Sequence, residues 1–178
     1  MTEYEETIKW LAKARKNEVF YNSSESHATV VLSSMFENAE HYVHTVCGDL
    51  CGDLSTNSEF IKQVENFLSS DPNRKFYVLF DAYNEKFGET KLAKILLKYS
   101  EQVQTRRLKD AAYLTYKGIR AHLTISDNRA FRLEINVDDK MAFGNFNDKE
   151  KAKIFDDVFN RYFSDDEHTE PIDLTNAA

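Results

Sequence analysis

The stretch that decides the fold is IRAHLTISDNRAFRLEINVDDKMAFGNFND, residues 119–148. Apolar and polar side chains alternate along residues 119–126, and a second alternation runs along residues 131–137. A period of two residues is typical of β-strands. The residues between the two runs, 127–129, read Asp-Asn-Arg and favour a turn. The sequence therefore predicts an antiparallel β-hairpin.

The length of the hairpin loop fixes which side chains lie opposite each other. A two-residue loop would mix polar and apolar side chains on both faces, whereas a three-residue loop pairs His122 with Glu134 and keeps one face apolar. A slip of one residue would move every side chain to the other face. We therefore expect the three-residue loop, with Asn128 or Arg129 in the left-handed conformation.

In this register, one face of the hairpin is polar. It carries an imidazole opposite a carboxylate, two guanidinium groups, a hydroxyl and an amide: His122, Glu134, Arg120, Arg132, Thr124 and Asn136. A carboxylate opposite an imidazole fixes its tautomer and favours its protonated form. Two guanidinium groups nearby suit a phosphate or a carboxylate. The alternative is a solvated outer face, on which charged cross-strand pairs are ordinary.

The same residues carry a resemblance to a known family. Over residues 20–164 the chain resembles one half-domain of the phospholipase D superfamily, whose signature is H-x-K-x4-D followed by G-S-x-N. His122 lies where the signature histidine would, and Thr124 occupies the lysine position. Arg129 occupies the aspartate position, with Asp127 two places earlier. The segment 144–147, Gly-Asn-Phe-Asn, is similar to the G-S-x-N step.

The resemblance implies a phosphodiesterase-like site, in which the histidine attacks phosphorus and the lysine neutralises the phosphoryl oxygens. The candidate catalytic residues are His122, Glu134 and Asn147, which we expect to share one pocket. The candidate ligand-binding residues are Arg120, Thr124, Arg132 and Asn145. A chain with one signature copy implies a homodimer, since such a site would then be completed across a twofold axis. No cofactor and no metal are expected.

The rest of the chain alternates helical and strand patterns. Continuously apolar or β-branched runs at 42–47 and 75–80 predict strands, and apolar residues at helical spacing predict helices between and after them. The expected fold class is α/β, a single-domain mixed β-sheet flanked by helices on both faces, which agrees with the resemblance. The expected division is an N-terminal helix at 1–17, the α/β domain at 18–164 and a mobile acidic tail at 165–178.

Two features follow the predicted central strands. Asp81 comes directly after the run at 75–80, and open α/β sheets place ligand-binding groups at the carboxyl ends of their strands. The tetrapeptide CGDL occurs twice in residues 47–54. His44, Cys47 and Cys51, with Asp49 or Asp53, are candidate metal ligands, but their spacing is not that of a zinc site, and we favour small buried cysteines at a strand end.

Composition limits the classes of function. The 178 residues are enough for one well-cored domain, with 42% hydrophobic residues and a formal net charge of −7. An acidic chain is a poor ligand for duplex nucleic acid, although Arg106, Arg107 and Lys109 form one basic cluster, for which a solvated face is the simpler interpretation. No apolar run approaches the roughly 20 residues that span a bilayer. With no signal-peptide pattern and two cysteines, the sequence indicates a cytoplasmic protein.

Three functions remain open. The one we favour is a catalytically altered phospholipase D-like protein that binds a partner or a phosphate-bearing ligand, because the signature lysine is replaced by Thr124. The second is an active phosphodiesterase or nuclease with His122 as nucleophile at a dimer interface. The third is an interaction module whose polar face is ordinary wet surface.

Overall fold

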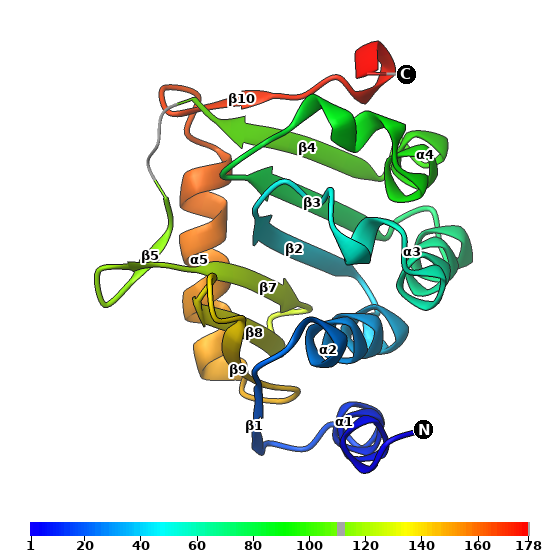
Figure 1. The fold of residues 1–178 in the computed structure, drawn as a ribbon, viewed down its shortest axis with the longest axis vertical. Helices are drawn as coiled ribbons and strands as arrows, with labels where there is room; N and C mark the ends of the chain where they lie inside the picture. The colour runs from blue at the N-terminus through cyan, green and yellow to red at the C-terminus, as the bar shows by residue number, and fades with distance from the viewer. Residues whose placement is uncertain (110–112, 178) are drawn as a thin grey trace.

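A computed structural model describes residues 1–109 and 113–177, and its central feature is an eight-stranded mixed β-sheet (Figure 1). In spatial order the strands are β1 (Val19–Asn22), β9 (Met141–Asn145), β8 (Ala130–Asn136), β7 (His122–Ser126), β2 (Tyr42–Cys47), β3 (Lys75–Phe80), β4 (Val103–Leu108) and β10 (Thr169–Pro171). The neighbours β2, β3 and β4 are parallel, and the other pairs are antiparallel. The predicted mixed α/β sheet is confirmed.

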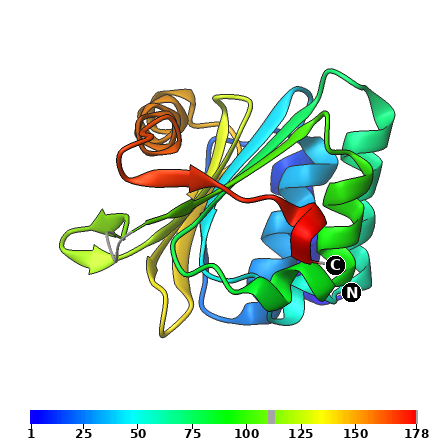
Figure 2. The same cartoon turned by 90° about the horizontal axis from the view of Figure 1, so that it is seen from above.

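Helices cover both faces of this sheet. Four lie on one face: α1 (Glu3–Lys13), α2 (Glu25–Asn38), α3 (Ser58–Ser70) and α4 (Lys91–Lys98). The fifth, α5 (Lys149–Phe163), lies alone on the opposite face (Figure 2). Short elements complete the described chain: η1 (Asp53–Ser55), η2 (Glu85–Glu89), η3 (Leu174–Ala177) and the hairpin of β5 (Thr115–Tyr116) with β6 (Ile119–Arg120).

Local sequence explains where the helices begin. Ser24, Asn57 and Asp148 each accept a hydrogen bond from a backbone N–H in the first turn of α2, α3 and α5. Such caps satisfy donors that the helix itself leaves unpaired. The apolar faces then pack into two cores, one between the sheet and α1 to α4 and the other between the sheet and α5. Both faces of the central strands are therefore buried.

The hairpin has the predicted register. His122 lies opposite Glu134 and Ser126 opposite Ala130, with a three-residue loop between β7 and β8. The left-handed residues of the loop are Asp127, at φ 55°, and Asn128, at φ 48°. Asn128 was expected in this conformation, and Asp127 rather than Arg129 accompanies it.

The Asp127 carboxylate joins the hairpin loop to the start of β2. It accepts hydrogen bonds from the backbone N–H groups of Glu40, His41 and Tyr42, at 2.7, 2.9 and 3.0 Å. These donors precede or open a strand and have no partner in the sheet on that side. Asp127 therefore has a structural role that accounts for a carboxylate at the turn.

The polar face of the hairpin is not a solvated outer face. Leu123 and Ile125 of β7 pack in the core beneath α5, so the alternate residues of the strand point toward the layer of α1 to α4. On that side Thr124, Arg132 and Glu134 are 4%, 4% and 7% exposed. The interpretation as wet surface is therefore excluded for these three side chains.

The chain after α5 differs from the expected mobile tail. Residues 169–171 form β10, which pairs with β4 and closes that edge of the sheet. Thr169 is 1% exposed and Leu174 is 7% exposed, so the segment contributes buried groups. Arg106 and Arg107 of β4 bind Asp166 and Glu170. The acidic residues that suggested mobility are in part the counterions of the basic cluster.

Candidate functional site

The candidate site is centred on His122, at the start of β7, between two carboxylates. Its Nδ1 lies 3.0 Å from Oε2 of Glu134 on the neighbouring strand β8. Its Nε2 lies 3.3 Å from Oδ2 of Asp81, whose side chain is fully buried after β3. The second contact is close enough for an ion pair but lacks the geometry of a hydrogen bond, so the buried Nε2 has no hydrogen-bond partner within the described residues.

Two arginines hold these carboxylates from opposite sides. Arg132 donates from Nη2 to Oε1 of Glu134 at 2.9 Å and from Nε to Asn22 of β1 at 3.0 Å. Arg120 donates from Nε to Oδ2 of Asp81 at 2.9 Å and from Nη2 to Oδ1 of the same carboxylate. The result is one continuous network of polar contacts across the sheet, with the imidazole at its centre.

The electrostatics of this polar network favour the ionised form of each of its side chains. Burial alone lowers the pKa of His122, but the carboxylates of Asp81 and Glu134 outweigh it and the net pKa is raised. Burial alone raises the pKa of Asp81 and of Glu134. The positive charges of His122 and the arginines, with the hydrogen bonds that Arg120 donates to Asp81 and that His122 and Arg132 donate to Glu134, outweigh it, and both net pKa values are lowered. The two carboxylates therefore favour the imidazolium, which has a proton on each nitrogen, over the neutral ring.

A cavity of about 370 Å³, called the His122 cavity below, opens beside this polar network. Its lining includes a basic wall of His122, Arg120 and Arg132, to which Glu134 and Thr124 are adjacent. The lining from α2 and from the segment 47–54 combines apolar residues, such as Leu32 and Leu50, with the carboxylates of Glu25, Asp49 and Asp53. The volume is within the range of sites for small ligands.

The position of this cavity follows from the topology. Asp81 follows the carboxyl end of β3, and Gly48 follows the carboxyl end of the parallel strand β2. Ligands in open α/β sheets bind outside the carboxyl ends of the strands, as the sequence suggested for Asp81. A Cβ atom on Gly48 would lie 3.5 Å from Cε1 of His122, so this glycine leaves the space beside the imidazole open.

Thr124, at the position of the signature lysine, lines the cavity but is engaged by the neighbouring strand. Its hydroxyl lies 2.8 Å from the hydroxyl of Thr45 in β2, and its side chain has no charge to offer a phosphoryl oxygen. The structure therefore supplies cationic groups to the cavity from Arg120 and Arg132, on other strands.

The structure does not bring the two candidate asparagines to the cavity. Asn145 donates to Oδ1 of Asn17 at 2.8 Å, and its own Oδ1 accepts the backbone N–H of Asn147 at 2.8 Å. Asn145 lies opposite Phe131 in the sheet and not opposite Glu134. Neither asparagine lines the His122 cavity. Of the seven candidate residues the structure therefore brings five together: His122, Glu134, Arg120, Thr124 and Arg132.

Sequence reasoning missed two contributors to the site, Asn22 and Gly48, and one contact of a residue that it had singled out, Asp81. The contact between Asp81 and His122 joins residues from different strands, and alternation within one hairpin carries no signal for it. Asn22 ends β1 and reaches Arg132 from a different strand, so the alternation within the hairpin carries no signal for it either. Gly48 lies in the CGDL repeat that the sequence analysis singled out, but no role was assigned there to its glycines.

Metal ligation by the CGDL segment is not supported by the geometry. The imidazole of His44 points to the opposite face of the sheet, where Nδ1 lies 2.7 Å from Asp156 of α5 and the ring stacks on Phe159. Cys47 is buried, and burial raises the pKa of its thiol. His44 and Cys47 therefore lie on different faces and do not form a ligand set.

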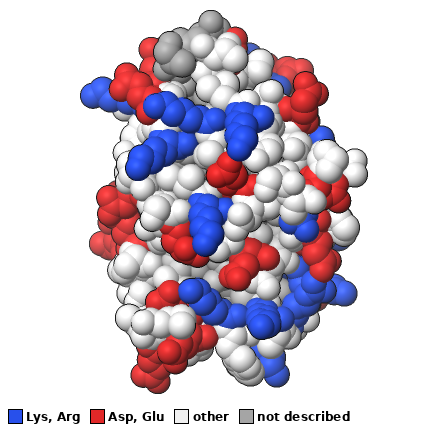
Figure 3. All heavy atoms as spheres, turned by 90° about the vertical axis from the view of Figure 1, so that its right-hand side faces the viewer, with Lys and Arg blue, Asp and Glu red and all other residues white. Residues whose placement is uncertain are grey.

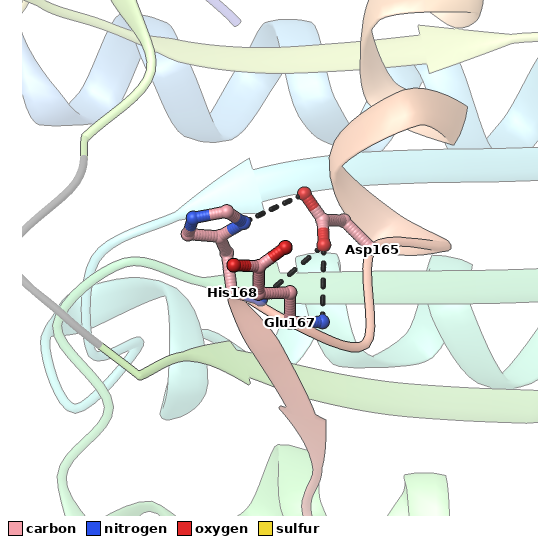
Figure 4. Close-up of side chains that lie close together, drawn as sticks. All are labelled: Asp165, Glu167 and His168. Carbon is pink, nitrogen blue, oxygen red and sulfur yellow. Dashed lines mark hydrogen bonds and ion pairs between the residues drawn. The ribbon is translucent and has the colours of Figure 1, made fainter.

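One group in the described chain has the spacing of metal ligands, and it lies at the end of α5 (Figure 4). Asp165, Glu167 and His168 bring potential ligand atoms within 4.8 Å of one another. Oδ1 of Asp165 accepts the backbone N–H groups of Glu167 and His168, and Oδ2 lies 2.9 Å from Nδ1 of His168. These contacts are those of a turn between α5 and β10, and the group does not line the His122 cavity.

Comparison with solved structures identifies proteins of similar fold. No protein-family model and no curated protein matches the sequence. TrmBL2, an archaeal chromatin protein whose structure shows a novel mode of DNA binding, aligns with a TM-score of 0.62 at 16% identity over 94% of this chain and 60% of its own. The chain thus spans about 60% of the length of TrmBL2.

Two further solved structures belong to the phospholipase D superfamily. NucT from Helicobacter pylori has a TM-score of 0.56 at 15% identity, covering 82% of this chain and 94% of NucT. Phosphatidylserine synthase from Haemophilus influenzae Rd KW20 has a TM-score of 0.53 at 10% identity, covering 90% of this chain and 40% of that enzyme. This protein therefore has a phospholipase D-like fold.

Proposed function

We propose that the chain is a binding module of phospholipase D-like fold, which holds a small phosphate-bearing ligand in the His122 cavity and does not cleave it. The observation that carries the proposal is the placement of His122 between two carboxylates, at 3.0 Å and 3.3 Å from its two ring nitrogens. A nucleophilic imidazole needs a lone pair on one nitrogen. A ring flanked in this way favours the imidazolium, which has none.

The same arrangement supports anion binding. Nε2 of His122 is a buried donor that lies 3.3 Å from Oδ2 of Asp81 but makes no hydrogen bond within the described chain, and a ligand or water in the cavity would satisfy it. Nη1 of Arg120 and Nη1 of Arg132 make no hydrogen bond within the described residues, and neither is fully buried. Three cationic donors thus face one cavity, and charge-assisted hydrogen bonds of this kind suit phosphate oxygens.

The test uses isothermal titration calorimetry with glycerol 3-phosphate, beside a hydrolysis assay with bis-p-nitrophenyl phosphate. We expect binding by the wild type, binding at least about tenfold weaker in Arg132→Gln because a charge-assisted hydrogen bond is removed, and no hydrolysis above background. The variant Arg15→Gln, on the exposed end of α1, is the matched control and should bind as the wild type does.

Two results would replace the proposal with its alternatives. Hydrolysis that disappears in His122→Ala would show an active phosphodiesterase. Absence of both binding and hydrolysis would favour an interaction module without a small ligand. The predicted homodimer is a separate part of the proposal, and light scattering on the purified protein measures it directly.

A further inference from the structure

A tyrosine outside the His122 cavity covers one of the two arginines that line it. The ring of Tyr113 lies over the guanidinium group of Arg120, with 4.4 Å between Cζ of the arginine and the centroid of the ring. Tyr113 itself does not line the cavity. At this distance a guanidinium group is attracted to the face of an aromatic ring. Tyr113 can therefore act on the site only through Arg120.

The hairpin of β5 with β6 brings the two side chains together. Residues 117–118 form its two-residue turn and both have positive φ, which is typical of a type I′ turn. In this register Thr115 lies opposite Arg120. Residues two apart in an extended chain point to the same side, so Tyr113 is a diagonal cross-strand neighbour of Arg120. Leu114, buried in the core beneath α5, anchors this part of the chain.

The two arginines of the cavity are held to different degrees. The side chain of Arg132 is 5% exposed and donates hydrogen bonds to both Asn22 and Glu134. The side chain of Arg120 is 33% exposed, and within the described residues it donates only to the carboxylate of Asp81. Fixing a long, partly exposed side chain costs conformational entropy. Arg120 therefore depends more than Arg132 on any further contact that holds it.

The ring of Tyr113 supplies such a contact on a different side of the guanidinium group. Nε and Nη2 of Arg120 form the edge that donates to Asp81, whereas the ring covers a face. The guanidinium group is planar, so contacts on one edge and one face together restrict its rotation. Nη1 remains as the donor that a ligand can use.

We infer that Tyr113 is a positioning residue of the His122 cavity, which fixes the guanidinium group of Arg120 for a phosphate-bearing ligand without touching that ligand. The inference rests on the proposed function and adds a residue from outside the cavity lining. The phenol hydroxyl has no part in this role, because the attraction comes from the face of the ring.

Calorimetric titration of the full chain with glycerol 3-phosphate tests the effect on binding. Tyr113→Leu should bind about two- to fivefold more weakly than the wild type, the size of a partly exposed cation–π contact. Tyr113→Phe keeps the ring and should bind as the wild type does. Tyr21→Leu, the same change at an exposed tyrosine of β1 that does not line the cavity, is the matched control and should also bind normally.

A double-mutant cycle separates positioning from a general loss of structure. In an Arg120→Gln background, the further change Tyr113→Leu should leave the affinity unchanged, because the group that the ring positions is absent. Circular dichroism confirms that each variant is folded.

A second measurement reports on Arg120 without any ligand. Phenylglyoxal modifies guanidinium groups, and mass spectrometry of peptides gives the rate at each arginine. Relative to Arg161, an exposed arginine of α5, the rate at Arg120 should rise about two- to fivefold in Tyr113→Leu and stay unchanged in Tyr113→Phe.

The outcomes distinguish the inference from the function on which it rests. Absence of wild-type binding would refute the proposed function. Wild-type binding that is undiminished in Tyr113→Leu would refute the positioning role and leave the proposed function intact. Equal modification rates at Arg120 in the wild type and in Tyr113→Leu would refute that role independently of any ligand. A loss in Tyr113→Phe as large as in Tyr113→Leu would refute the ring as its cause.

Discussion

The carboxylates of Asp81 and Glu134 raise the pKa of His122, and the raised pKa makes the stability of the protein depend on pH. A group whose pKa is raised on folding stabilises the protein fully below its unfolded pKa, and that contribution disappears as the pH rises through the folded pKa. The contributions of Asp81 and Glu134, whose pKa values are lowered, disappear instead as the pH falls through those values. The site is therefore most stabilising between these two limits.

His122→Gln tests this at the level of one residue. At pH 6 we expect the free energy of unfolding to fall by about 2 kcal/mol, because hydrogen bonds to charged partners are lost. On the alkaline side of the usual histidine pKa of about 6.5, the wild type should lose its advantage as the imidazolium deprotonates. Urea denaturation of both proteins from pH 6 to 10 measures the difference, and a gap that stays constant with pH would contradict the charged state assigned here.

At the scale of the elements, β10 completes an edge of the sheet with residues that the sequence had assigned to a mobile acidic tail. Its pairing with β4 covers the main-chain groups of that strand and places acidic side chains beside Arg106 and Arg107. An exposed strand edge is a template for association with other chains. Residues 169–174 thus belong to the folded domain.

Deleting residues 165–178 should therefore destabilise the protein and expose the edge of β4. Loss of the buried Leu174 and of the strand pairing is expected to cost about 2 to 4 kcal/mol. Differential scanning calorimetry measures the stability, and size-exclusion chromatography detects association through β4. Leu174→Ala, which removes burial but keeps the strand, should lose about half as much and remain unassociated. A truncated chain with unchanged melting temperature would show that β10 contributes nothing.

The comparison between sequence and structure is most instructive at this scale. The strands at 42–47 and 75–80 and the hairpin register were predictable because their apolar patterns repeat with a fixed period. The strand β10 was not, since three residues with a proline carry no such pattern. The cross-strand pair of His122 and Glu134 followed from the register, whereas Asp81 reaches His122 through the order of strands in the sheet. The separation of Asn147 from the cavity could not be foreseen for the same reason.

For the whole molecule, the distribution of charge decides which large partners are accessible. On the face formed by α1 to α4, basic and acidic side chains are interspersed without a broad field of one sign (Figure 3). Arg106 and Arg107 are paired with acidic groups, and the net charge is −7. No helix in the described part of the chain has the length and apolar character that crossing a membrane demands.

We therefore expect no measurable affinity for duplex DNA, in contrast to what is stated of TrmBL2. Duplex binding depends on neutralising phosphates and is strongest at low salt. Fluorescence anisotropy with a labelled duplex at about 50 mM salt, the low end of the range over which such binding is strong, gives the most permissive conditions. Salt-sensitive binding there would contradict the expectation and point to a basic surface formed by more than one chain.

The carboxylate of Asp127 also bears on how the protein is made. It accepts hydrogen bonds from the main-chain N–H groups of residues 40–42, so these groups have this partner only after residue 127 has been synthesised. During synthesis β2 emerges well before β7, its neighbour in the finished sheet. A growing polypeptide therefore cannot complete its sheet stepwise, and the native arrangement can be reached only once the hairpin has left the ribosome.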